Sequence, residues 1–200
     1  MKFVENEIFH VYNRGNQKQP IFFNRGNYLY FLQKVRYHLF PVCDLLAYCL
    51  MPNHFHFLIR ANSKTVAKIP NPNPLINNTA FSKELGKMLS SYTRAIQKQE
   101  GFTGSLFQQK TKAKQVSGTP ADGSDYVSTC FAYILNNPVQ AGFVRSPEDW
   151  EYSNYRDLVG LRCGDLCNQE MIREELGFTV TTIQDLLGRH IPAIENPALF

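Results

Sequence analysis

The distribution of apolar and polar positions predicts alternating strands and helices along the first 140 residues. Strands are predicted at 8–14, 42–50 and 54–59, because bulky apolar residues gather there without an internal glycine or proline. Apolar residues three and four positions apart predict helices at 27–39 and at 82–99, the second capped by Ser82. Residues 105–116 predict a further strand. A last core helix is predicted from Ser124 or Asp125 to Asn137, because the residue before Pro138 leaves the α region.

This order of elements predicts an α+β fold of the ferredoxin-like kind, βαββαβ plus one extra helix, with a mainly antiparallel sheet. The prolines and asparagines of residues 61–80 predict a long loop. Residues 170–200 predict one or two short helices packed on the outside. We therefore expect a core domain at residues 1–160 and an acidic, helical C-terminal tail at residues 161–200.

The strand at 54–59 carries the first candidate chemistry. Side chains alternate along a strand, so His54 and His56 lie on one face, and Phe55, Phe57 and Ile59 lie on the other. Two imidazoles one pleat apart form a two-point chelate for a divalent metal. A pair of histidines on a half-exposed strand face is the alternative, and an isolated His-x-His pattern does not decide between the two.

The last core helix carries the second candidate group. Its apolar face is predicted to contain Val127, Phe131, Ile134 and Leu135, and beside it runs a stripe of Tyr126, Cys130, Tyr133 and Asn137. Tyr133 and Asn137 are four apart and therefore neighbours. A metal held by the two histidines, with the Asn137 amide oxygen as third ligand, would polarise a phosphodiester beside the Tyr133 phenol. The alternative is a boundary tyrosine and an ordinary Asn-Pro helix end.

Composition narrows the class of protein. A hydrophobic content of 44% with 13% aromatic residues is typical of a folded globular chain. No apolar run is long enough to span a bilayer, and the charged first residues are not typical of a signal peptide. Five cysteines, an odd number without paired spacing, favour reduced thiols and a cytoplasmic location. We expect no membrane partner.

The charge is unevenly distributed along the chain. Residues 1–147 hold 17 Lys and Arg against 7 Asp and Glu, a net charge of +10, whereas residues 148–200 have a net charge of −6. A basic body is compatible with a nucleic-acid partner. Lys110, Lys112 and Lys114 are two positions apart and are predicted to share one face of a strand. They would contact a polyanion or, equally well, lie in solvent on an edge strand, where lysines discourage aggregation.

Several segments together resemble a known family. They are Met51-Pro52-Asn53-His54-Phe55-His56, Tyr133-Ile134-Leu135-Asn136-Asn137-Pro138-Val139 and Trp150-Glu151-Tyr152-Ser153-Asn154-Tyr155, with His10-Val11-Tyr12-Asn13-Arg14-Gly15 and Gly104-Ser105-Leu106-Phe107-Gln108. Over roughly residues 5–160 the chain is similar to the single-tyrosine HUH transposases of bacterial insertion sequences, and most of all to REP-associated tyrosine transposases.

The resemblance implies a metal-dependent enzyme that cleaves single-stranded DNA beside a hairpin and then rejoins it, with no nucleotide cofactor. Cleavage would give a 5′-phosphotyrosine link and a free 3′-hydroxyl. Tyr133 matches the catalytic tyrosine, His54 and His56 match the HUH metal pair, and Asn137 matches the polar residue that completes the metal site. The metal implied is Mg²⁺ or Mn²⁺, and histidine ligation favours Mn²⁺. Asn136 is an alternative ligand if the helix ends early, and Tyr126 is the second choice of nucleophile.

The partner implied is single-stranded or hairpin DNA, bound by a monomer or a homodimer. The candidate DNA-binding cations are Arg14, Lys83, Lys87, Arg94, Lys110, Lys112 and Lys114. Two other functions compete with the transposase hypothesis. A non-catalytic, ferredoxin-like nucleic-acid-binding protein would bind without metal and leave DNA intact. A His-x-His zinc hydrolase ranks last, because such enzymes usually have a barrel of about 250 residues and further ligands.

Overall fold

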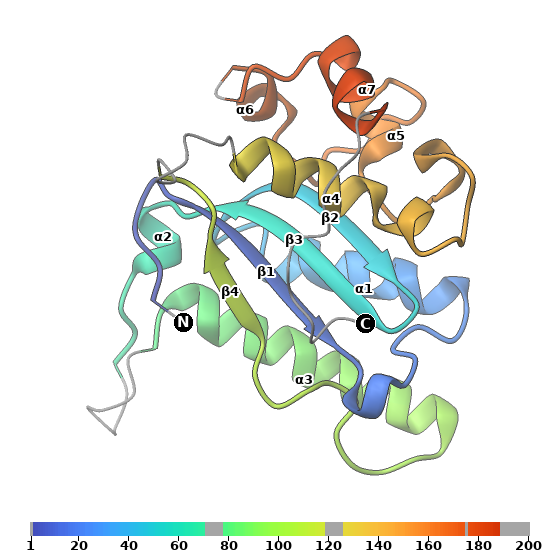
Figure 1. Cartoon of the computed structure of the whole chain (residues 1–200). Coiled ribbons are helices and arrows are strands. Elements are labelled where there is room, and N and C mark those ends of the chain that lie inside the picture. The colour runs from blue at the N-terminus through green and yellow to red at the C-terminus, as the bar shows by residue number, and fades with distance from the viewer. Residues whose placement is uncertain (1, 71–77, 119–125, 175, 189–200) are drawn as a thin grey trace.

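The computed structural model describes residues 2–70, 78–118, 126–174 and 176–188 (Figure 1). Its strands are β1 (Ile8–Arg14), β2 (Asp44–Met51), β3 (His54–Arg60) and β4 (Lys112–Gln115). Its α-helices are α1 (Arg25–His38), α2 (Ser63–Val66), α3 (Ala80–Glu100), α4 (Tyr126–Gln140), α5 (Tyr155–Leu158), α6 (Gln169–Glu174) and α7 (Val180–Gly188). Two short 3₁₀ turns, η1 (Asn16–Lys18) and η2 (Pro147–Asp149), complete the described elements.

The four strands form one sheet in the order β2-β3-β1-β4, and every neighbouring pair is antiparallel. Helices α1 and α3 cover one face, and α4 lies across the other (Figure 1). The order of β1, α1, β2, β3, α3 and β4 along the chain, with β1 and β3 at the centre, is the ferredoxin-like arrangement. The predicted fold class is therefore confirmed.

The alternation predicted for β3 determines how the core packs. Phe55 and Phe57 lie on the face covered by α1 and α3, where both rings contact Phe31, at centroid distances of 5.4 and 6.3 Å. Tyr92 of α3 packs edge-on against Phe31, and its hydroxyl donates to the Ile21 carbonyl at 2.7 Å. Because side chains alternate along a strand, these aromatic residues lie on one face of the sheet and His54 and His56 project from the other.

Helix α4 is covered on two sides. Residues Cys130–Leu135 are buried without interruption, because the sheet lies beneath the helix and the C-terminal segment packs above it. Phe131, predicted to face the core, contacts Phe178 at a centroid distance of 4.7 Å, and Ile172, Phe178 and Ile183 belong to the same buried cluster. Helices α6 and α7 agree with the short outer helices predicted for residues 170–200, of which 175 and 189–200 lie outside the described residues. The division at residue 160 stays a prediction.

The sequence-based boundaries are wrong in two loops and one cap. Within the predicted loop at 61–80, residues 63–66 form α2, and Lys68 pairs with Thr79; positions 71–77 lie outside the described residues. Helix α3 begins before Ser82, because the hydroxyl of Thr79 accepts a hydrogen bond from the Ser82 N–H and caps the helix. The strand predicted at 105–116 is confined to 112–115, since residues 105–111 meet β1 only irregularly.

The end of α4 also differs from the prediction, while the predicted caps Ser124 and Asp125 lie outside the described residues. The helix continues past Pro138 to Gln140, and the Ala141 N–H donates to the Asn137 carbonyl. Proline removes one helical hydrogen bond, yet packing on both sides of the helix outweighs that loss. Gly142, with φ at +72°, then ends the turn. No helix in the described ranges is long and apolar enough to cross a membrane.

Candidate active site

The two histidines of β3 face α4. Their ring centroids are 4.9 Å apart and the ring planes are nearly perpendicular. On the neighbouring strand β1, Tyr12 pairs with His56 and Arg14 pairs with His54. Directly opposed residues of paired strands project to the same side, so Arg14, a predicted DNA contact, lies on the histidine face, where it is almost completely buried.

Helix α4 brings its polar stripe onto this face. The Asn137 side-chain oxygen lies 3.1 Å from His54 Nε2, and the Tyr133 ring is 5.5 Å from the His56 ring, edge to face. These residues are about 80 positions apart in the chain, and the fold places them side by side. All of the residues predicted for the metal and the nucleophile therefore come together. Asn136 is not the nearer amide, because α4 does not end early.

His56 has one nitrogen occupied and one without a partner. Its Nδ1 lies 2.8 Å from His10 Nε2, and its Nε2 is buried without a hydrogen-bond partner in the described structure. Burial, aided by the neighbouring His54 and His10, lowers the pKa of His56 well below its ordinary value. If His56 Nδ1–H donates to His10, the Nε2 lone pair remains available for a metal ion.

His10 was not predicted as a site residue. It is 3% exposed, and burial followed by the charge of Lys114 lowers its pKa to about 3, so it is neutral near pH 7. A hydrogen-bond partner on the other ring nitrogen fixes the tautomer and orientation of a metal-ligating histidine. Its contact with His56 depends on which strands pair and in which register, information that periodicity alone does not contain.

His54 faces two amide oxygens. Burial lowers its pKa to about 4, although a hydrogen bond with Asn137 acts in the opposite direction, so the ring carries one N–H near pH 7. Nδ1 lies 2.6 Å from Asn53 Oδ1, and Nε2 lies 3.1 Å from Asn137 Oδ1. When Nδ1–H donates to Asn53, the Nε2 lone pair faces an oxygen lone pair, and a cation between the two atoms would satisfy both.

These atoms fit a divalent metal with a mixed nitrogen and oxygen donor set. The donors are His54 Nε2, the unpartnered His56 Nε2 and Asn137 Oδ1. No group of three or more His, Cys, Asp or Glu side chains suited to a metal occurs in the described part of the chain. An amide would therefore be the third protein donor to a metal at this position, and such a set would suit Mn²⁺ and, less strongly, Mg²⁺.

Tyr133 is buried among these groups. Burial raises the pKa of its phenol to about 12, while a hydrogen bond from Asn137 acts to lower it. The phenol is therefore protonated near pH 7 and is a weak nucleophile until positive charge approaches its oxygen. Tyr126, the alternative nucleophile, instead accepts a hydrogen bond from Lys114 Nζ at 2.8 Å, with the same ammonium 4.6 Å from its ring centroid.

The predicted DNA-binding cations do not form one surface. Lys112 and Lys114 of the edge strand β4 pair with Tyr12 and His10, and thus border the histidine face. Lys110 precedes β4 and lines a groove on the opposite face, beneath α3. Helix α3 also carries Lys83, Lys87 and Arg94, which are exposed. The single lysine face predicted from two-residue spacing is therefore wrong, because Lys110 is not in the strand.

Residues 150–154 cover the outer edge of β2. Asn154 accepts a hydrogen bond from the Tyr48 N–H at 2.9 Å and donates to the Leu46 carbonyl at 3.2 Å, while Leu50 N–H donates to the Tyr152 carbonyl. The amide of Asn154 thus pairs with β2 as another strand would. This segment belongs to the motifs that carry the family resemblance, and it closes a sheet edge rather than supplying a reactive group.

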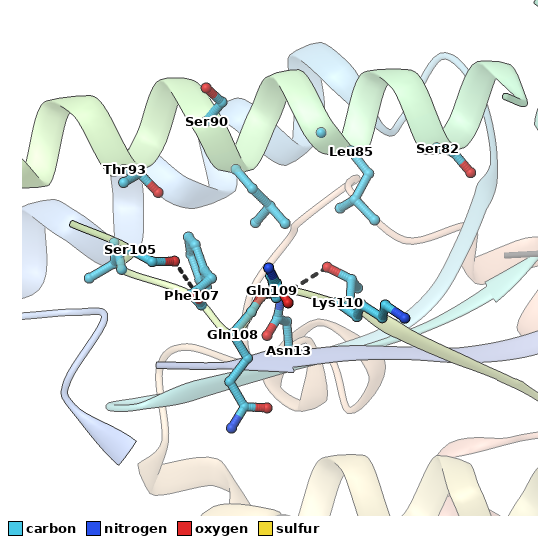
Figure 2. A pocket seen from close by; sticks show the side chains of 14 residues that line it. Asn13, Ser82, Leu85, Ser90, Thr93, Ser105, Phe107, Gln108, Gln109 and Lys110 are labelled. Atoms are coloured by element: carbon cyan, nitrogen blue, oxygen red, sulfur yellow. Dashed lines mark hydrogen bonds between the residues drawn. The ribbon is translucent and has the colours of Figure 1, made fainter. Parts of the chain in front are cut away.

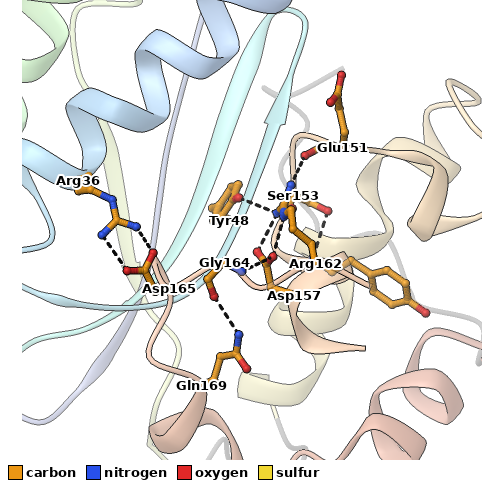
Figure 3. A network of polar contacts seen from close by, with 10 residues as sticks. Arg36, Tyr48, Glu151, Ser153, Asp157, Arg162, Gly164, Asp165 and Gln169 are labelled. Atoms are coloured by element: carbon orange, nitrogen blue, oxygen red, sulfur yellow. Dashed lines mark hydrogen bonds and ion pairs between the residues drawn. The ribbon is translucent and has the colours of Figure 1, made fainter. Parts of the chain in front are cut away.

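Arg162 fixes the segment that follows. It binds both carboxylate oxygens of Asp157, at 2.6 and 2.7 Å, and donates to the carbonyls of Glu151 and Ser153 (Figure 3). It also donates to the Tyr48 hydroxyl of β2 at 3.1 Å. Nearby, Arg36 of α1 pairs with Asp165. The sequence did not predict this network, which ties the C-terminal segment to the edge strand β2.

A scan of protein-family models and a search of curated proteins each find no match to this chain. Among solved structures, the chain is similar to a REP-associated tyrosine transposase bound to a REP hairpin, with a TM-score of 0.55 and 16% identity over 84% of this chain and 92% of that chain. At this identity the likeness shows a shared fold. The resemblance predicted from the motifs is thus confirmed at the level of the fold.

Two further solved structures are of a bacterial tRNA(His) guanylyltransferase-like protein. The complex with ATP has a TM-score of 0.41 and 13% identity, over 90% of this chain and 75% of that chain. The complex with GTP has a TM-score of 0.40 and 13% identity, over 72% and 71%. Both are too distant to bear on the fold or the site.

Proposed function

We propose that this protein is a metal-dependent DNA transposase that cuts and rejoins single-stranded DNA beside a hairpin through Tyr133. The observation that carries the proposal is the meeting of a phenol, two neutral imidazoles and an amide oxygen on one sheet face. The fold shared with a transposase that was solved with a REP hairpin supports DNA as the substrate. Lys112 and Lys114 border the same face and would contact phosphates, and the almost completely buried Arg14 adds positive charge beside His54.

The proposed reaction is a transesterification. The Tyr133 oxygen attacks the phosphorus, a tyrosyl–phosphate bond forms, and the bond to the 3′ oxygen of the preceding nucleotide breaks. One proton leaves the phenol and one is taken up by the departing 3′ oxygen. The new ester retains the energy of the phosphodiester, so a 3′-hydroxyl can later attack it, restore the DNA and release the tyrosine.

The chain's own residues prepare this step. His54, His56 and Asn137 would hold Mn²⁺ or Mg²⁺, which when bound supplies positive charge beside the phosphate. His10 holds His56 by its Nδ1, and Asn53 holds His54 by its Nδ1, so both Nε2 atoms keep a fixed direction. Asn137 also hydrogen-bonds to Tyr133, which counteracts the effect of burial on the phenol's pKa.

The test uses a hairpin oligonucleotide with single-stranded flanks, Mn²⁺ and the full chain. We expect a covalent adduct with the wild type and none with Tyr133→Phe, which removes only one oxygen atom. Tyr126→Phe is the matched control and should form the adduct, because Tyr126 contacts Lys114 rather than the histidines. Mass spectrometry of the proteolysed adduct identifies the modified tyrosine. An adduct that persists in Tyr133→Phe excludes Tyr133 as the nucleophile.

The non-catalytic alternative predicts a different set of results. A binding module would retain the oligonucleotide in the presence of a chelator, and no variant would change the length of the DNA. We instead expect His54→Ala and His56→Ala to abolish the adduct while leaving DNA affinity within a few fold, because phosphate contacts by lysine and arginine dominate binding. DNA that is bound but never cut under any metal condition would favour the binding module.

A further inference from the structure

A concave site lies on the sheet face opposite Tyr133. It is a groove with a volume of about 730 Å³ between α3 and residues 105–111 (Figure 2). Asn13 of β1 lines it, whereas the next residue, Arg14, lies on the histidine face. The groove and the candidate active site therefore lie back to back across the central strands. Its volume falls within the range of roughly 300–1,000 Å³ that is typical of small-ligand sites.

The lining of the groove combines apolar surface with neutral hydrogen-bonding groups. Leu89 of α3 supplies aliphatic surface above the almost completely buried Leu85, and Gln109 lies in the facing segment, whereas the Gln108 side chain points away from α3 (Figure 2). The Gln109 side chain has no hydrogen bond to another described residue. No acidic side chain lines the groove within the described part of the chain. Aliphatic and amide groups together suit a planar heterocycle with donors and acceptors on its edge, such as a nucleobase.

Gly86 is a second indication of a ligand. It lies in the interior of α3 and lines the groove, although glycine is disfavoured inside helices. A Cβ added at Gly86 would have no atom within 4 Å, so the packing of the protein does not require glycine here. The absent side chain instead leaves the helix surface open to a molecule in the groove.

Positive charge flanks the groove and continues to the other face. On α3, Lys83 and Arg94 lie within one turn of the groove residues Gly86 and Ser90. On the facing wall, Lys110 is followed by Lys112 and Lys114 of β4, the edge strand of the sheet, which border the histidine face. A backbone of phosphates leaving the groove would therefore meet cations along the edge of β4 up to the candidate active site.

We propose that this groove binds an unpaired nucleotide of single-stranded DNA, and that the strand then passes over the edge of β4 to Tyr133. The course of the strand to Tyr133 rests on the proposed function, whereas binding in the groove does not. The base contacts Leu89 and the Gln109 amide, while Lys110 and Arg94 contact phosphates. This divides the predicted DNA-binding residues into two groups, one for each face of the sheet.

The test fills the groove without removing any contact. Gly86→Ala and Gly86→Leu place successively larger side chains in open space and raise helix propensity, so both variants should melt at or above the wild-type temperature. Affinity is measured by fluorescence anisotropy with a labelled, unstructured single-stranded oligonucleotide, in the Tyr133→Phe background and without metal. We expect a graded loss, at least tenfold for Gly86→Leu. Unchanged affinity of a folded Gly86→Leu protein would overturn the proposal.

A charge test accompanies the steric one. Lys110→Ala should weaken binding severalfold and reduce the slope of log affinity against log salt by about 0.7, as expected for one phosphate contact with a single strand. Lys64→Ala removes an exposed cation from α2 and serves as the matched control, with no change expected. Equal effects of the two substitutions would mean that Lys110 acts only through overall charge and would overturn its assignment to the groove.

The outcomes separate this proposal from the proposed function. If the wild type forms no tyrosine adduct but Gly86→Leu still weakens binding, the catalytic proposal falls and the groove stands. If the adduct forms and Gly86→Leu leaves single-strand affinity unchanged, the groove alone falls. A blunt hairpin that loses affinity in Gly86→Leu while the single strand does not would assign the groove to duplex DNA, and this result also overturns the proposal.

Discussion

Replacing His10 by leucine tests how the candidate site is held together. His10 and His56 are 3% and 0% exposed, and their nitrogens are 2.8 Å apart. Leucine fills a similar space but leaves His56 Nδ1 buried without a partner, which costs about 1–3 kcal/mol of unfolding free energy. Loss of the hydrogen-bond partner of a metal-ligating histidine typically weakens metal binding by about 10–100-fold. His10→Gln keeps a polar group in reach of Nδ1 and should restore most of the metal affinity.

Two measurements separate stability from metal binding. Unfolding in urea without metal gives the change in free energy, and isothermal titration calorimetry with Mn²⁺ gives the affinity of the folded chain. Val35→Ala on α1 is the control, because it truncates a fully buried side chain remote from the histidines and should cost on the order of 2 kcal/mol. We expect Val35→Ala to lose stability while its Mn²⁺ affinity remains that of the wild type.

If His10→Leu loses stability yet binds Mn²⁺ as tightly as the wild type, His10 is a structural residue alone and does not position a metal ligand. A wild-type protein that remains folded and binds no Mn²⁺ would contradict the metal site itself. In that case the unpartnered Nε2 of His56 is not a metal ligand, and the metal-dependent mechanism is withdrawn.

Three further predictions concern the framework behind the site. Asn154→Ala should lower the unfolding free energy by roughly 2–4 kcal/mol, because two buried backbone groups of β2 lose their partners; a loss below 0.5 kcal/mol in urea denaturation would contradict this. Arg162→Met should lower the unfolding free energy by about 3 kcal/mol, since the Asp157 carboxylate is 7% exposed and would lose its guanidinium partner. The double variant Arg162→Met with Asp157→Leu should recover part of that free energy, and no recovery would refute the pairing. Hydrogen bonds with His38, first, and with Lys87 lower the pKa of Glu84 in the folded protein. The Glu84 carboxylate therefore stabilises the fold above its unfolded-state pKa of about 4.3. This stabilisation is lost as the pH falls through the lower pKa of the folded state. The stability difference between wild type and Glu84→Gln should therefore shrink as the pH falls from 5 toward 3, and a difference that persists unchanged at pH 3 would contradict the assignment.

Local sequence patterns predicted those features that depend on one element at a time. The bounds of β1, the face shared by His54 and His56, and the one-turn spacing of Tyr133 and Asn137 follow from strand and helix periods. The fold class followed from the order of the elements. What brings the histidines and the tyrosine together is the packing of α4 on one face of the sheet, and the motif resemblance rather than periodicity pointed to it.

The features that the sequence did not predict depend on contacts between distant segments. The approach of His10 to His56 requires the β1–β3 register, and the role of Asn154 requires knowing that β2 is an edge strand. Lys110 was grouped with Lys112 because two-residue spacing was extended beyond the start of β4. The helix end at Asn137 was wrong because burial of α4 on both sides outweighs the local preference before proline.

The placement of Tyr133 and both histidines within a single protomer has a kinetic consequence. If Tyr133 is the nucleophile and the two histidines hold the metal, as proposed, the chain would not have to meet another copy of itself before reacting. Under the proposed function, with DNA in excess, the first-order rate of adduct formation per molecule should be the same in dilute and concentrated protein. Mixing the variants Tyr133→Phe and His56→Ala should not restore activity, since the tyrosine of one chain would not reach the histidines of another.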